Sequence, residues 1–480
     1  MKPLAKTHFP LAKTLILLLA LPVLAVLVSG CGGKRESEYP YGYTTRVLVD
    51  ESTGIQNYGI SWEPAISADG RYVAFNAPLQ FYDGKAAYGI TSSVFVYDRK
   101  TGETVCASAG SDGKPVDGYH AVISADGRYV AFTSGSDNLA SIDTNQYIDI
   151  YVRELKTGKM VLASMASNEL PANARSLRPS ISADGRYVAF ESEASNLVKD
   201  DTNEVADIFV ADLDSGKIRR VSVASDGTEA NGPSFSGVIS ASGRYVTFLS
   251  EARNLAAGVE AMGIFLYDLD KDETVFITDE QGIVVAHSTR PAISADGRFV
   301  VFSGGHNDSV YMLQDYGLYL YDRKSGKVEF LVKGLGGELP ESPAYNPSIS
   351  KDGRYVAFES SAGNLVAGDT NQQVDIFVLD RKENTIQRVS VSAQNIPGDM
   401  NSYDPALSAD GQHVAFVSEA RNLTAGYPTG AIGVFMHDIS KWGDFPSIDA
   451  RRFGQAEPFA DPYPPPTRVP LSYPYPAPPP

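Results

Sequence analysis

Cysteine, tryptophan and histidine are scarce in this chain of 480 residues, which has 2, 2 and 6 of them respectively. Two cysteines cannot form a disulfide framework, so the fold must be held by its core alone. No two histidines have the spacing of a zinc site, and the Gly-x-Ser-x-Gly turn of serine hydrolases is missing. We therefore find no catalytic constellation in the sequence and expect a binding protein more readily than an enzyme.

Dense runs of lysine and arginine are also missing. Acidic residues outnumber basic ones by 58 to 41, which gives a formal net charge of −17. A nucleic-acid-binding surface needs clustered basic side chains, so nucleic acid is excluded as a partner.

The first thirty residues have the pattern of a secretory signal. Basic residues precede an apolar run over 15–28, which is too short for the roughly 20 residues of a membrane-spanning helix. The sequence Leu-Val-Ser-Gly before Cys31 resembles the lipobox of bacterial lipoproteins. The resemblance implies cleavage after residue 30, a lipid on Cys31, and attachment to the membrane of the cell envelope. An ordinary signal cleaved nearby and an uncleaved anchor are the alternatives.

Two further segments have no repeat pattern. Residues 31–44 are expected to be a polar tether. Residue 32 is glycine and not aspartate, which resembles the sorting signal of outer-membrane lipoproteins if the source is Gram-negative. The body of the protein would then face the periplasm or the cell surface. Residues 446–480 are expected to be disordered, because 11 of the last 24 residues are proline, which favours extended polyproline II. The tail is either a spacer or a ligand for a proline-binding domain.

Between these ends the chain repeats itself seven times. Each copy centres on a sequence like Ile-Ser-Ala-Asp-Gly-Arg-Tyr-Val-Ala-Phe, and the repeat serines are 54 to 58 residues apart. These serines are Ser67, Ser124, Ser182, Ser240, Ser294, Ser350 and Ser408.

Each repeat resolves into four strands joined by turns. In the third copy we expect strands over 178–182, 186–191, 207–211 and 218–224, with Gly185 in the first turn. The seventh copy lacks a fourth strand, and the missing pattern occurs at 45–52. The sequence thus predicts an all-β, seven-bladed β-propeller over 45–445, in which the N-terminal strand completes the last blade. A linear β-solenoid is the alternative.

The repeats resemble the PD-type, WD-like repeats of the TolB-like propellers, and this resemblance implies a scaffold that binds partner proteins.

A loop motif rich in aspartate and asparagine follows the second strand in three repeats. Such side chains cap backbone amides in tight loops, but they are also hard oxygen ligands for Ca²⁺. The candidate calcium ligands are Asp143, Asn145, Asp149, Asp201, Asn203, Asp207, Asp369, Asn371 and Asp375.

A more variable position of the repeat opens the innermost strand, three residues before the repeat isoleucine or leucine. We call its seven side chains the mouth ring, because they should meet at one end of the propeller channel. They are Glu63, His120, Arg178, Ser236, Arg290, Asn346 and Asp404. The simpler interpretation is a solvated rim.

The mouth ring suggests two functions of different classes. The first is an envelope-anchored platform that binds an envelope protein or peptide. The second is a glycan-binding or glycan-active propeller, in which Arg178 and Arg290 hold an anionic sugar and Glu63 and Asp404 act as acid and base. Of the histidines, only His120 and His287 are expected near this site.

Overall fold

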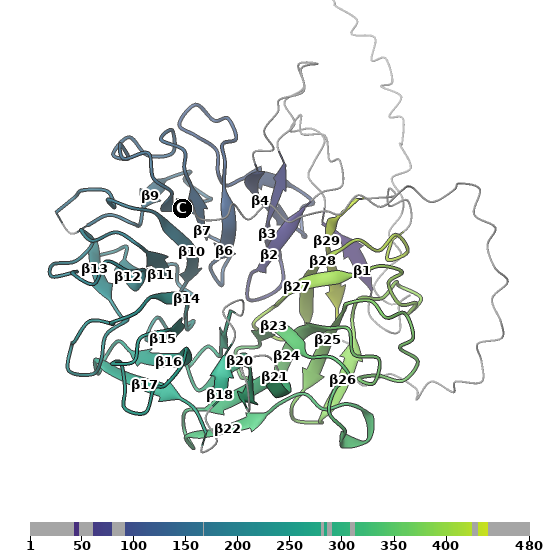
Figure 1. Ribbon diagram of the computed structural model, residues 1–480. Coiled ribbons are helices and arrows are strands. Elements are labelled where there is room, and N and C mark those ends of the chain that lie inside the picture. The colour runs from purple at the N-terminus through teal and green to yellow at the C-terminus, as the bar shows by residue number, and fades with distance from the viewer. Residues whose placement is uncertain are drawn as a thin grey trace, which may run out of the picture. The chain divides into compact units, whose positions relative to one another are not determined.

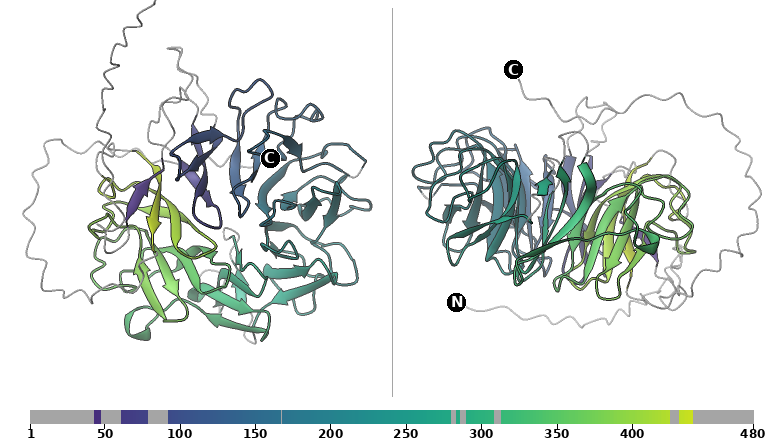
Figure 2. Two further views of the ribbon diagram at one scale, coloured as in Figure 1. Left: turned by 180° about the vertical axis from the view of Figure 1, so that it is seen from behind. Right: turned by 60° about the horizontal axis from the view of Figure 1, so that its bottom comes forward.

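The computed structural model describes residues 43–47, 61–78, 92–166, 168–279, 283–285, 290–307, 313–424 and 431–439. The predicted signal, Cys31, the tail and His287 lie outside these residues. Within them seven antiparallel sheets follow one another around a central axis, and the only helical turn is Leu335–Gly337 (Figures 1 and 2). None of the described residues forms a helix long and apolar enough to cross a membrane. The fold is a seven-bladed β-propeller, as predicted.

The first four blades are regular four-stranded sheets. They consist of β2 (Trp62–Ile66), β3 (Tyr72–Pro78), β4 (Ser92–Asp98) and β5 (Thr104–Cys106); β6 (Tyr119–Ile123), β7 (Tyr129–Ser134), β8 (Asp149–Glu154) and β9 (Met160–Leu162); β10 (Ser176–Ile181), β11 (Tyr187–Ser192), β12 (Asp207–Asp212) and β13 (Lys217–Arg220); β14 (Ser234–Ile239), β15 (Tyr245–Ser250), β16 (Gly263–Asp268) and β17 (Glu273–Ile277).

The last three blades depart from this plan in two places. They consist of β18 (Ile283–Val285), β19 (Ala292–Ile293), β20 (Phe299–Asn307), β21 (Leu313–Asp322) and β22 (Lys327–Phe330); β23 (Ala344–Ile349), β24 (Tyr355–Ser360), β25 (Asp375–Asp380) and β26 (Thr385–Arg388); β27 (Ser402–Leu407), β28 (His413–Ser418), β29 (Gly433–Asp438) and β1 (Thr44–Arg46). Blade 5 has an inner edge in two pieces and a long β20–β21 hairpin, and blade 7 takes its outermost strand from the start of the described chain.

The N-terminal strand β1 lies antiparallel beside β29, with Thr44 opposite His437. The Val47 amide donates to the Val434 carbonyl at 2.9 Å, and Thr44 Oγ1 lies 2.9 Å from Nδ1 of the buried His437. Of the predicted strand 45–52, residues 48–52 lie outside the described residues. The described part occupies the place in blade 7 that the fourth strand has in the other blades.

The predicted fourth strand of blade 3 was too long. It was expected over 218–224 and ends at Arg220. The cause is Ser222, whose hydroxyl accepts the Ile208 amide at 3.0 Å in place of a backbone carbonyl. Because a side chain takes over this hydrogen bond, the ladder of backbone hydrogen bonds ends at Arg220, two residues before Ser222.

The repeat motif builds each blade and joins it to the next. Ser67 Oγ donates to Asp69 at 2.8 Å and accepts the Tyr72 amide at 2.9 Å, which fixes the turn between β2 and β3. Gly127, in the equivalent turn of blade 2, has φ of +72°, and the Tyr72 ring packs so closely on it that a Cβ would lie 2.1 Å away. The same pairing of a ring with a turn glycine recurs at every interface, and His413 on Gly70 closes the set between blades 7 and 1.

The face that carries these turns is also joined by backbone hydrogen bonds. Each turn donates one amide to the turn of the next blade, at 2.9 to 3.2 Å, through all seven interfaces. The last of these bonds runs from the Asp410 amide to the Ala68 carbonyl. Within each blade, a buried aromatic ring of the second strand packs beside one of the third strand, as in Phe248 and Phe265, whose ring centroids are 5.7 Å apart. The constant part of the repeat therefore holds the ring of blades together.

Candidate functional site

All seven residues of the mouth ring line one cavity of about 610 Å³. They sit where the innermost strands begin, on the face opposite the turns, and deeper residues of the same strands form the cavity wall. The predicted convergence of these side chains is what the structure shows.

The backbone of the mouth ring has an unusual conformation. Six of its residues have φ between +48° and +54°, and none of the six is glycine. They are Glu63, His120, Arg178, Ser236, Asn346 and Asp404. The strand register shifts at this point in each of their blades, for example between Leu177 and Ser180 in blade 3. A left-handed conformation costs an ordinary residue roughly 1–2 kcal/mol, so this strain must be held in place by neighbouring contacts.

Two glutamates that sequence reasoning missed provide such contacts. Glu191 accepts the Ser236 amide of the next blade at 3.0 Å and Arg178 Nη1 of its own blade at 3.1 Å. Glu359 repeats the arrangement with the Asp404 amide at 2.8 Å and Asn346 Nδ2 at 3.0 Å. The available signal was a charged residue directly after the apolar Tyr-Val-Ala-Phe of repeats 3 and 6.

One side of the mouth is cationic. Arg290 reaches from blade 5 to blade 3, where its Nη2 donates to the Pro179 carbonyl at 2.8 Å. Burial lowers the pKa of Arg290, and the nearby positive charge of Arg178 lowers it further. Burial also lowers the pKa of His120, and the two arginines add to this effect against the attraction of Glu63. The imidazole is therefore neutral at pH 7, and the two guanidinium groups carry the positive charge.

The other side of the mouth is acidic. Asp404 is accessible to solvent, but it is also surrounded by the cavity wall. The wall keeps part of the water away from its carboxyl group. This desolvation, together with the negative charges of Glu359 and Glu63, raises the pKa of Asp404 to about 7. Desolvation likewise raises the pKa of Glu359. The mouth thus presents a pair of arginines and a group of carboxylates within one cavity.

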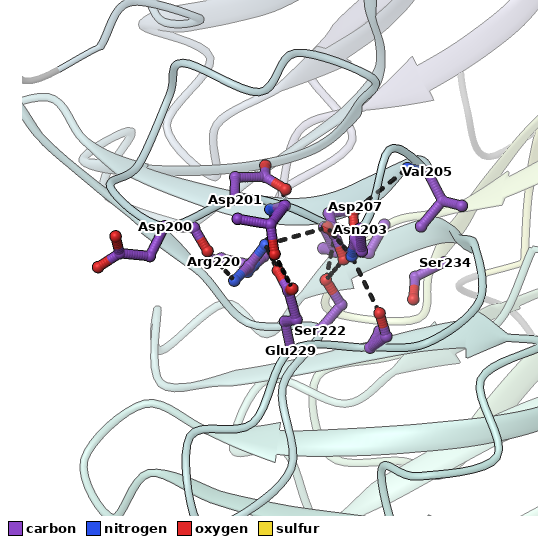
Figure 3. A network of polar contacts seen from close by, with 12 residues as sticks. Asp200, Asp201, Asn203, Val205, Asp207, Arg220, Ser222, Glu229 and Ser234 are labelled. Carbon is purple, nitrogen blue, oxygen red and sulfur yellow. Dashed lines mark hydrogen bonds and ion pairs between the residues drawn. The ribbon is translucent and has the colours of Figure 1, made fainter.

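The aspartate-rich loop of blade 3 forms a closed polar network (Figure 3). Asn203 Nδ2 donates to Asp207 at 2.8 Å and to the Ala230 carbonyl at 3.0 Å. Arg220, whose side chain is largely buried at the end of β13, places its Nη1 2.9 Å from Asp201 and 3.4 Å from Asp207. The guanidinium therefore occupies the space between the carboxylates that a cation would take.

Blade 6 repeats this network, whereas blade 2 does not. Arg388 Nη1 lies 2.9 Å from Asp369 and 3.1 Å from Asp375. In blade 2, Leu162 stands at the arginine position, and the Tyr151 hydroxyl donates to Asp143 instead.

These contacts support the structural interpretation of the loops. No group of three or more histidine, cysteine or acidic side chains in the described part of the chain could hold a metal ion. The calcium hypothesis for the three loops stays a prediction.

Cys106 and two further histidines have structural surroundings. Cys106 is half-buried, and burial raises the pKa of its thiol to about 11. His413 packs on Gly70, and His437 faces Thr44 in the outer part of blade 7.

Comparison with known proteins shows likeness in structure only. No protein-family model matches the chain, and no curated protein matches it in sequence. The oligogalacturonate lyase of Vibrio parahaemolyticus superposes with a TM-score of 0.50 and 13% identity, over 83% of this chain and 97% of that one. The propeller domain of the Trilobed protease from Pyrococcus furiosus gives 0.49 and 15%, over 79% and 92%. TolB from Acinetobacter baumannii gives 0.38 and 14%, over 78% and 81%.

At such identities the likeness concerns the fold alone. The predicted seven-bladed β-propeller fold is confirmed. No activity follows from it, because propellers serve many unrelated functions.

Proposed function

We propose that this protein is a protein-interaction platform of the cell envelope, anchored by a lipid on Cys31, and that the mouth ring is where it binds its partner. The observation that carries the proposal is the convergence of the seven copies of one variable repeat position on one cavity of about 610 Å³. Constant positions of the repeat build the ring of blades, so the variable ones are free to serve recognition.

The chemistry of the cavity suits an extended peptide segment. Its volume lies within the roughly 300–1,000 Å³ of typical ligand pockets. It offers arginines and carboxylates from side chains, and it is lined by the innermost strands, which are edge strands of their sheets. A peptide can satisfy all of these groups at once, because it brings its own amides, carbonyls and charges.

Capture from envelope extract tests the proposal. We expect tagged full-length protein to retain a defined protein, and the double variant Arg178→Ala/Arg290→Ala to lose it. The control is Lys156→Ala/Lys324→Ala, which removes two exposed charges from turns on the opposite face. Capture that survives loss of both arginines would refute a role for the mouth. Adding EDTA in parallel tests the calcium hypothesis.

A second candidate is an anionic glycan. It is favoured by two arginines that reach into the cavity shared with Glu63 and Asp404, and a protein named as an oligogalacturonate lyase has the same fold. An array of acidic oligosaccharides would distinguish the two. Sugar binding that is lost in the double arginine variant while protein capture persists would assign the mouth to glycans.

A further inference from the structure

Aromatic residues stand next to the mouth ring. In five repeats the residue directly before the ring position is Trp62, Tyr119, Phe235, Tyr345 or Tyr403. Tyr345 is the most open of these, with 37% of its surface exposed. Its ring centroid lies 5.8 Å from that of Tyr316, which comes from the long hairpin of blade 5. Blades 5 and 6 thus contribute a pair of tyrosine rings, one of which directly precedes the cavity-lining Asn346 in the chain.

The acidic side of the mouth adjoins Tyr345 through Glu359. Tyr345 is directly opposite Glu359 in the β23–β24 ladder, and Glu359 bonds the Asp404 amide. Asn346 Nδ2 donates to both carboxylates, and the Asp404 amide donates to Glu359 as well. Among the described residues, neither acid forms an ion pair. Glu191, in the same position of blade 3, has Arg178 as its partner. The acidic side therefore lacks the positive charge that its counterpart has.

We propose that Tyr316, Tyr345, Glu359 and Asp404 form a subsite for a cationic group, the ammonium or guanidinium of a lysine or arginine side chain on the bound protein. The faces of aromatic rings and ionised carboxylates both attract such a group. The inference rests on the proposed function and deepens it. Because Arg178 and Arg290 face the same cavity, the recognised segment carries a carboxylate as well as a cation.

A side chain fits this subsite better than a metal ion does. Divalent cations are held by several oxygen ligands, and none of the described acidic and histidine side chains form a group that could hold one. Tyrosine rings contribute surface to an organic cation and no ligand to a metal. Of the four residues, Asp404 lines the cavity of about 610 Å³, from which a long side chain could reach it.

The subsite gives binding a characteristic pH dependence. The groups that face Asp404 are Glu63, Asn346 and Glu359, and the two acids help to raise its pKa to about 7. A bound cation favours the ionised carboxylate, so it lowers this pKa and binding releases a proton. Affinity should rise as the pH increases from 6 to 8, and this trend should vanish in Asp404→Asn.

Calorimetry with synthetic peptides tests the inference. The probes are blocked hexapeptides with one aspartate and one lysine separated by zero to three residues, and matched peptides with norleucine for lysine. We expect full-length protein to bind the best lysine peptide about tenfold more tightly than its norleucine analogue. Asp404→Asn and Tyr345→Ala should each reduce this ratio to near one, whereas Arg178→Ala should weaken both peptides alike. Asparagine tolerates the left-handed backbone of residue 404, so Asp404→Asn should fold.

The control variant is Asp214→Asn, which removes an exposed carboxylate from a turn on the opposite face and should leave the ratio unchanged. Equal affinity of wild-type protein for lysine and norleucine peptides would overturn the subsite and leave the platform intact. The same holds if Asp404→Asn keeps the full ratio. No binding of any peptide by the wild type would overturn the platform and the subsite together.

Discussion

Replacing Arg220 with leucine tests whether the blade 3 network is a structural device. Leucine is what blade 2 has at this position. The arginine side chain is 9% exposed, and it contacts Asp201 at 2.9 Å, Glu229 at 3.0 Å and Asp207 at 3.4 Å. Removing one partner of a buried ion pair leaves charge without compensation, which costs about 3–5 kcal/mol. We expect Arg220→Leu to lose free energy of unfolding in that range at pH 8.

The loss should depend on pH. Even with the arginine present, burial raises the pKa of Asp201 to about 6 and raises that of Asp207 as well. Without it, both carboxyls will hold their protons to higher pH in the folded state than in the unfolded state. The folded state then binds more protons, so stability falls as the pH rises above about 4. Urea unfolding at pH 5 and pH 8 should show a smaller difference between variant and wild type at pH 5.

The chain itself suggests a rescue. Tyr151 of blade 2 corresponds to Phe209 of blade 3, and its hydroxyl bonds the loop aspartate. Phe209→Tyr added to Arg220→Leu should therefore recover part of the lost stability. A loss below about 1 kcal/mol at pH 8, as for an exposed ion pair, would refute the reasoning, and so would a loss that is the same at both pH values.

Three further perturbations follow from the fold. Gly185→Ala should lower the free energy of unfolding by more than about 2 kcal/mol, measured by chemical unfolding, because the new Cβ would lie 2.2 Å from the Tyr129 ring. The control is Gly216→Ala, whose Cβ would meet nothing within 4 Å, so this variant should lose only about 1 kcal/mol. Equal losses would contradict the contact. Deleting residues 44–47 should lower the stability by at least the roughly 1.5–3 kcal/mol that the burial of Val47 contributes, and this should lower the melting temperature. An unchanged melting temperature would show that β1 does not stabilise the fold. Cys106, with its pKa raised to about 11, should react with a disulfide reagent at pH 8 far more slowly than after unfolding.

The fold could be predicted because its contacts follow the repeat. A serine, a turn glycine and an aromatic ring at fixed spacing make the same bonds in each blade, so the pattern specifies both the sheet and its neighbour. The mouth ring was found for the same reason, since one position repeated seven times must lie on one circle. Its left-handed backbone was not predicted, because glutamate, histidine and arginine rarely adopt positive φ.

The hydrogen-bond partners of the mouth ring could not be predicted from a single sequence. Glu191 bonds the amide of Ser236, which lies 45 residues away in the next blade, and nothing local marks this pairing. Likewise the aspartates of the 201–207 loop were recognised as loop-forming or metal-binding, but the arginine between them comes from a different strand. Such contacts depend on the angle between neighbouring elements, which composition and spacing do not encode.

The strain in the mouth ring argues for a role in recognition. A solvated rim in a left-handed conformation is best served by glycine, yet the six strained positions include Glu63, His120 and Arg178. We expect His120→Gly to stay within about 1 kcal/mol of wild-type stability, because relief of strain offsets the lost packing and the larger backbone entropy of the unfolded chain. Its amide keeps the bond to Glu63. The same variant should weaken partner capture. A loss of more than about 2 kcal/mol would mean that the imidazole holds the blades together, and the strain would then reflect architecture rather than recognition.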